Sequence, residues 1–151
     1  MILISACLCG VNCKYSGGNN EHREILDLFK NEEVVLVCPE QLGGMETPRL
    51  PHEIVGGTGK DVIEHRAKVL SKEGDDSTEK FLKGAYETLN IAKLYNAKVA
   101  ILKAKSPSCG AGKIYDGTFS SNSINGNGVT AELLIKNGIK VYTEENFKLM
   151  R

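Results

Sequence analysis

Three of the five cysteines follow short apolar runs, at positions where a parallel sheet would bring them together. Cys7 and Cys38 each end such a run, and Cys109 lies in the loop after another run, residues 99–103. Short β-branched runs bounded by Gly, Pro, Asn and Ser are typical of buried strands. Because open parallel sheets bind ligands at the carboxyl ends of their strands, we expect the three thiols to share one edge. Three thiols in that position are suited to a metal or an iron–sulfur cluster with one coordination position left free.

The spacing of the cysteines narrows the kind of metal site. A buried free cysteine often serves only as a small apolar side chain, so no single cysteine indicates a metal site by itself. Structural zinc prefers close pairs such as C-x2-C, whereas the close cysteines here are Cys7, Cys9 and Cys13, with no second close pair. A cluster on separated cysteines therefore fits better than a zinc ribbon. Cys13, in a glycine-rich turn, is open as a fourth ligand, a redox thiol or a structural residue, and Cys9 is expected to line the core.

Polar residues beside these cysteines are candidates for acid–base chemistry. Glu40 follows Cys38 by two residues in a segment held by Pro39, and a carboxylate beside a metal site can act as a general base. The alternative interpretation is that Glu40 is a solvated glutamate on the surface with no role in chemistry. Ser106 precedes Cys109 in a Ser-Pro-Ser segment, where turn formation is the usual role of serine. The three histidines match no metal-binding spacing and are expected at the surface.

The composition is that of an ordinary water-soluble globular chain. Charged residues make up 25% and hydrophobic residues 41% of 151 residues, and the formal net charge is +0. The overall charge thus gives no general attraction to nucleic acid or to an anionic membrane. No apolar run approaches the roughly 20 residues of a membrane span, and the first residues lack the features of a signal peptide. We therefore expect no membrane association, and a cytoplasmic location in which thiols stay reduced.

The order of apolar runs and helical patterns predicts an α/β fold. We expect a single domain over residues 1–151, with a mostly parallel central sheet of about four strands and helices on both faces. Its strands are expected in the runs 2–7, 34–38, 99–103 and 139–142. Three helices are expected. The first runs from Asn19 or Asn20 to about Lys30, and the third follows a cap at Thr130. The second begins within residues 76–80 and ends near Asn96, and its apolar face consists of Phe81, Ala85, Leu89 and Ala92. Residues 53–55 and 68–70 are expected to form a small inserted β-hairpin.

Seven motifs, in order, resemble the thiouracil desulfidase-like family, long known as a bacterial domain of unknown function. The resemblance extends over nearly the whole chain. The motifs are Ser5-Ala6-Cys7-Leu8, Asn12-Cys13-Lys14-Tyr15, Cys38-Pro39-Glu40, Gly43-Gly44, Pro48-Arg49, Lys105-Ser106-Pro107-Ser108-Cys109-Gly110 and Gly128-Val129-Thr130-Ala131.

The resemblance implies a cytoplasmic α/β enzyme with a [4Fe–4S] cluster on three cysteines. It implies that a thiolated pyrimidine exchanges its sulfur for oxygen from water without net redox change and releases sulfide. By resemblance, the catalytic carboxylate is Glu40 and the catalytic hydroxyl is Ser106. We assign Cys7, Cys38 and Cys109 as cluster ligands, with Cys13 as the substitute for Cys7, since only Cys7 ends a strand run. Cys9 stands where the family pattern leads us to expect an apolar residue.

Three functions remain open at this point. The first is a desulfidase acting on a thiolated nucleobase or nucleoside, with thiolated tRNA as a further candidate substrate. The second is a non-catalytic iron–sulfur or metal-binding module that senses redox state or carries sulfur. The third is a metal-free thiol enzyme that uses Cys109 as its nucleophile. The first requires Glu40 and Ser106, whereas the second requires only the ligands.

Overall fold

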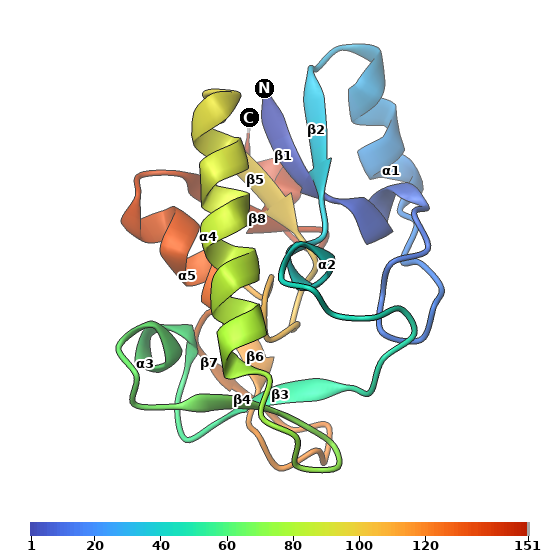
Figure 1. Cartoon of the computed structure of the whole chain (residues 1–151). Coiled ribbons are helices and arrows are strands. Elements are labelled where there is room, and N and C mark those ends of the chain that lie inside the picture. The colour runs from blue at the N-terminus through green and yellow to red at the C-terminus, as the bar shows by residue number, and fades with distance from the viewer. Residues whose placement is uncertain (151) are drawn as a thin grey trace.

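The structure of the protein is a computed structural model that describes residues 1–150 (Figure 1). Residue 151, the last of the expected domain, lies outside the described residues. At the centre is a four-stranded parallel sheet in the order β2-β1-β5-β8. Its strands are β1 (Ile2–Ser5), β2 (Val34–Val37), β5 (Val99–Leu102) and β8 (Lys140–Thr143). The two inner strands, β1 and β5, are buried almost throughout, which explains why their sequences are continuously apolar. The predicted α/β fold with a mostly parallel sheet is confirmed.

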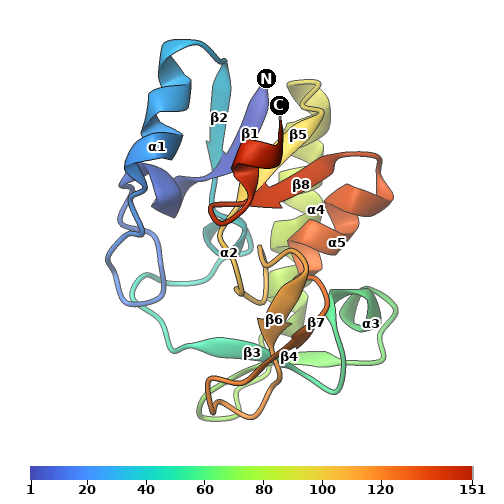
Figure 2. The same ribbon diagram turned by 180° about the vertical axis from the view of Figure 1, so that it is seen from behind.

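Helices cover both faces of this sheet, as expected (Figures 1 and 2). Leu3 packs into the core under the longer helices, while its neighbours Ile2 and Ile4 pack into a second core on the other face. On the first face lie α2 (Pro39–Leu42), α4 (Thr78–Leu94) and α5 (Val129–Lys136). On the second lie α1 (Arg23–Leu26) and the 3-10 helices η1 (Ala6–Cys9), η2 (Asp27–Lys30) and η3 (Phe147–Met150). Within residues 1–150, no helix is both long and apolar enough to cross a bilayer.

The longest helix matches its prediction, and two shorter helices begin elsewhere than expected. The expected apolar face of α4 is buried in the core, and Asn96 follows the helix in a left-handed conformation, with a φ of 52°. The helix expected from residue 19 or 20 begins only at Arg23, because the backbone N–H groups of Asn20 and His22 donate to carbonyl groups of η1. The predicted cap at Thr130 is wrong, since Gly128 precedes the first helical residue.

Two small antiparallel hairpins lie beyond the carboxyl ends of the central strands (Figure 2). The first, β3 (His52–Val55) with β4 (Lys68–Ser71), is the predicted insertion, although a short helix, α3 (Gly59–Ile63), joins its strands. The second, β6 (Lys113–Tyr115) with β7 (Ser123–Asn125), lies in a segment for which the sequence predicted no strand or helix. Its strands are three residues long, too short for a clear alternation of apolar and polar residues.

Candidate active site

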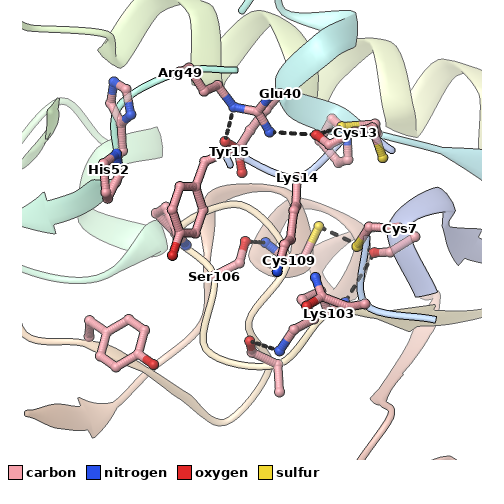
Figure 3. Close-up of a pocket in the computed structure, with 18 of the residues that line it drawn as sticks. Cys7, Cys13, Lys14, Tyr15, Glu40, Arg49, His52, Lys103, Ser106 and Cys109 are labelled. Atoms are coloured by element: carbon pink, nitrogen blue, oxygen red, sulfur yellow. Dashed lines mark hydrogen bonds and ion pairs between the residues drawn. The ribbon is translucent and has the colours of Figure 1, made fainter. Parts of the chain in front are cut away.

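A cavity of about 440 Å³ lies at the carboxyl ends of β1, β2 and β5, between the sheet and the two hairpins (Figure 3). This is the edge at which parallel sheets place their ligands. Its lining comes from segments far apart in the chain: the turn after β1, the start of α2, the loop after β5 and residues of both hairpins. The predicted gathering of strand ends into one site is therefore present in the structure.

Four cysteines line the cavity: Cys7, Cys13, Cys38 and Cys109. Cys7, Cys13 and Cys109 are buried, and Cys38 is half-buried. The structure thus brings together the three proposed ligands and also Cys13, the proposed substitute. Cys9, which is half-buried, does not belong to the lining of the cavity, in line with its expected place outside the site.

The thiols influence one another's proton affinity. A hydrogen bond from the Cys13 thiol lowers the pKa of Cys7, and the same donor lowers the pKa of Cys38 to about 7. The pKa of Cys13 is correspondingly raised by its hydrogen bonds to Cys38 and Cys7. Burial raises the pKa of Cys109, although Ser5 Oγ donates a hydrogen bond to its sulfur at 3.5 Å. Cys7 and Cys38 are therefore the thiols that ionise most easily without a metal, whereas the Cys109 thiol would lose its proton when a metal binds.

The junction of β2 and α2 places Cys38 and Glu40 on the same wall. Pro39 occupies the first turn of α2, where its missing N–H costs no hydrogen bond. The helix is only four residues long and is held by α4, because Gly43 and Gly84 allow the two backbones to touch. A Cβ atom at either glycine would overlap a carbonyl oxygen of the other helix. This close crossing fixes the direction in which Glu40 enters the cavity.

The loop after β5 is shaped by hydrogen bonds around Ser106. Its Oγ accepts the backbone N–H groups of Ser108 at 3.1 Å and of Cys109 at 2.9 Å. The first N–H groups of α5, from Val129 and Thr130, donate to the carbonyl oxygens of Pro107 and Ser108. These bonds satisfy the start of α5 without a side-chain cap, which is why Thr130 does not serve as one. They also hold Cys109 and Ser106 at the cavity wall.

Arg49 holds the carboxylate of Glu40 and is the main site residue that the sequence analysis missed (Figure 3). Its Nε donates to Glu40 Oε1 at 2.9 Å, and its Nη2 donates to the carbonyl oxygen of Cys13 at 2.9 Å. The Arg49 side chain is only 6% exposed. The second oxygen of Glu40 accepts the Ser108 hydroxyl at 3.2 Å. One guanidinium therefore ties the α2 carboxylate to the loop that carries Cys13. The Pro48-Arg49 motif was the only sign of this role in the sequence.

Lys103 and His52 also line the cavity, and both are held by neighbours. Lys103 Nζ pairs with Glu144 Oε2 at 2.8 Å. His52, which was expected at the surface, is half-buried and lines the cavity. Its Nδ1 donates to the carbonyl oxygen of Leu50 at 2.7 Å, and its Nε2 accepts the hydroxyl of Ser77 at 2.9 Å. Burial lowers the pKa of His52, so the ring favours the neutral form.

Comparison with known proteins identifies the family. Residues 2–146 match the model of the 2-thiouracil desulfurase family. The chain is 49% identical over 144 residues to the uncharacterised protein YbbK of Bacillus subtilis (strain 168), covering 95% of each. It also superimposes on the structure of the [4Fe-4S]-dependent thiouracil desulfidase TudS with a TM-score of 0.85 and 34% identity, covering 98% of this chain and 93% of the other. The chain therefore belongs to the 2-thiouracil desulfurase family.

Proposed function

We propose that this protein is a [4Fe–4S]-dependent desulfidase that converts a thiolated pyrimidine to its oxo form. The overall reaction replaces C=S by C=O: the pyrimidine and one water give the oxo pyrimidine and hydrogen sulfide, and nothing is oxidised or reduced. Membership of the family and likeness to TudS support the cofactor and the thiouracil-type substrate. The observation that carries the proposal is the cavity itself, in which four thiols face a carboxylate and a serine hydroxyl.

The donor set suits a cluster better than a single metal ion. Within residues 1–150, no three Cys, His, Asp or Glu side chains converge closely enough to hold one ion. A cluster of four irons is larger and is held at its corners, so its ligand sulfurs stand apart around a cavity. Thiolates are the ligands that iron–sulfur clusters require. We assign Cys7, Cys38 and Cys109 as these ligands, with Cys13 as the substitute at the first position. When bound, a cluster with three cysteine ligands supplies an open iron site that polarises a soft C=S group.

Glu40 is assigned as the general base. Its two oxygens each accept one bond, from Arg49 and from Ser108, so a carboxylate with about four acceptor positions can still accept a proton from water. Arg49 fixes the direction of that carboxylate toward the cavity. A base held in this way activates water beside the thiocarbonyl carbon without first having to reorient.

Ser106 is assigned as the residue that orients the reacting group. Its Oγ already accepts two backbone N–H groups, so its own hydrogen is left to donate into the cavity. A donor at that place can align the attacking water or the oxygen that replaces the sulfur. A metal-free enzyme that uses Cys109 as nucleophile fits less well, because burial raises the pKa of that thiol and no metal is present to displace its proton.

The substrate is proposed to be a free thiolated nucleobase or nucleoside of the thiouracil or thiouridine type, with thiolated tRNA as a larger candidate. We propose a cytoplasmic location, since all five cysteines are free thiols and a reducing compartment keeps them so. The test is anaerobic reconstitution with iron and sulfide, followed by sulfide release from 2-thiouracil, 4-thiouridine and thiolated tRNA. Activity only in cluster-loaded protein supports the proposal. Loaded protein that is inert on all three substrates would instead favour a redox sensor or sulfur carrier.

A further inference from the structure

Glu53 is a buried carboxylate that faces the cavity and is not needed by the proposed chemistry. It lies on β3, is 8% exposed and belongs to the lining of the cavity. Within the part of the chain that the structure describes, Glu53 forms no ion pair. Its Oε1 instead accepts the backbone N–H groups of Gly117 at 2.9 Å and of Phe119 at 3.2 Å. A buried carboxylate needs such partners, so Glu53 and the loop 116–122 stabilise each other.

The loop that Glu53 holds has an uncommon backbone. Phe119 and Ser121 have φ values of 56° and 65°, in the left-handed region that bulky side chains rarely adopt. Gly117 lies so close to β3 that a Cβ atom there would be 2.6 Å from the carbonyl oxygen of Ile54. The loop is therefore clamped against β3 in a conformation that its residues do not favour on their own. Such backbone strain is concentrated at ligand-binding and catalytic sites.

The clamped conformation brings an aromatic side chain to the cavity. Phe119 is half-buried and lines the same cavity as Cys7, Cys109 and Glu40, although it comes from the loop between β6 and β7. An aromatic face beside a polar reaction site is what a planar heteroaromatic ring requires, because rings stack on one another without regard to their substituents.

We propose that Phe119 stacks on the pyrimidine ring of the substrate and that Glu53 is the positioning residue that holds it there. This inference rests on the proposed function for the identity of the ring. Phe119 contributes to binding and to the selection of planar rings, and it takes no part in proton transfer. Its loss should therefore raise KM and leave kcat nearly unchanged.

The experiment compares two substrates in cluster-loaded protein: 2-thiouracil, which is planar, and 5,6-dihydro-2-thiouracil, whose ring is puckered. Phe119→Ala should raise KM for 2-thiouracil about tenfold, the effect of losing one base–aromatic stack. It should also reduce the preference for the planar substrate about tenfold. Phe119→Tyr keeps the aromatic face and should behave as wild type. Phe29→Ala, which removes an exposed aromatic side chain outside the cavity lining, is the matched control.

Glu53 is tested by amide hydrogen exchange without any ligand. Glu53→Leu should release the N–H groups of Gly117 and Phe119 to exchange and raise KM as Phe119→Ala does. Glu53→Gln keeps an accepting oxygen and should restore both properties. Unchanged exchange in Glu53→Leu would overturn the positioning role.

The stacking role is overturned if Phe119→Ala lowers kcat at constant KM, or if it affects both substrates equally. Equilibrium dialysis with uracil, which has no sulfur, separates this inference from the proposed function. Suppose that cluster-loaded wild type desulfurates no substrate, and that Phe119→Ala binds uracil about tenfold more weakly than wild type does. The stacking role then stands and the desulfidase proposal fails. If uracil binds both proteins equally, the stacking fails.

Discussion

Gly84 of α4 lies directly against the carbonyl oxygen of Pro39, so that a Cβ atom at Gly84 would overlap it. The same is true in the opposite direction, since a Cβ atom at Gly43 would overlap the carbonyl oxygen of Lys80. The two helices thus touch through their backbones at the point where α2 delivers Cys38 and Glu40. A four-residue helix has little stability of its own, so this contact determines where it sits.

Gly84→Ala should separate the two helices. In an exposed helix this substitution normally stabilises, by about 1 kcal/mol. Here we expect it to destabilise the fold by about 2 kcal/mol, the cost of inserting a methyl group where no space exists. It should also lower the iron content after anaerobic reconstitution, because Cys38 is displaced. Urea unfolding and iron analysis measure the two effects. Lys83→Ala, at the exposed neighbouring position of α4, is the control, and equal stability of the two variants would contradict the prediction.

The ligand assignment predicts a pattern of iron retention. Cys7→Ser, Cys38→Ser and Cys109→Ser should each lose iron after anaerobic reconstitution, since each removes a thiolate at the cavity wall. Cys9→Ser should keep its iron, because Cys9 lies outside the lining. Cys13→Ser should also keep its iron, because Cys13 is assigned as a neighbour of the ligands and not as a ligand. If Cys7→Ser keeps iron while Cys13→Ser loses it, then Cys13 is the ligand and Cys7 is not.

The positions of the central strands could be predicted because they depend on local sequence. The run from Ile2 to Ile4 is apolar on both faces, so the sequence alone locates a buried strand there, but β1 ends at Ser5, earlier than the expected run 2–7, and Cys7 lies in η1. The place of Cys13 depends instead on a reversal of the chain at Gly10, which has a φ of 89°. That turn brings Cys13 back toward Cys7 and Cys38, and nothing in the spacing of cysteines indicates the direction of such a turn.

The polar contacts around Glu40 could not be predicted for a related reason. Arg49 reaches Glu40 only because residues 43–48 fold back on α2, and that path is set by contacts with α4 and with Tyr15. Phe119 likewise enters the cavity through a backbone conformation that a phenylalanine rarely adopts. Both features arise from tertiary contacts that override local preference, and both lie at the candidate site.

His52 predicts a pH dependence of stability. Burial lowers the pKa of His52 in the folded protein, so the unfolded chain binds its proton more tightly. The contribution of neutral His52 to the stability of the fold is complete above the pKa of about 6.5 that histidine has in the unfolded chain. It is lost as the pH falls through the lower pKa of His52 in the folded protein. Carboxylates also make stability depend on pH. We therefore compare wild type with His52→Gln by the free energy of unfolding in urea that each loses between about pH 7.5 and 5. His65→Asn, at an exposed histidine, controls for the loss of any imidazole. An equal loss of stability in wild type and His52→Gln would contradict the prediction.

Ser106→Ala should slow desulfuration by less than about 100-fold, the usual effect of removing one oriented donor. The loss is limited because the two backbone N–H groups freed in this variant remain in the cavity wall and can hold the water themselves. Ser106→Thr keeps the hydroxyl and should recover most of the rate. Sulfide release is measured with variants matched for iron content. A slow Ser106→Thr with normal iron would show that the shape of the loop, and not the hydroxyl, limits the reaction.

Glu40→Gln tests the general base most directly. The amide keeps the size of the carboxylate and can still accept a bond from Arg49, so the fold and the iron content should be unchanged. It cannot take a proton from water, and the rate should fall about 100-fold or more. Sulfide release and thiopyrimidine absorbance are followed anaerobically, with wild type and variant matched for iron. Glu46→Gln, which changes an exposed carboxylate outside the cavity lining, should keep full activity. Equal rates for Glu40→Gln and wild type would leave desulfuration standing and show that another group, or the solvent, removes the proton.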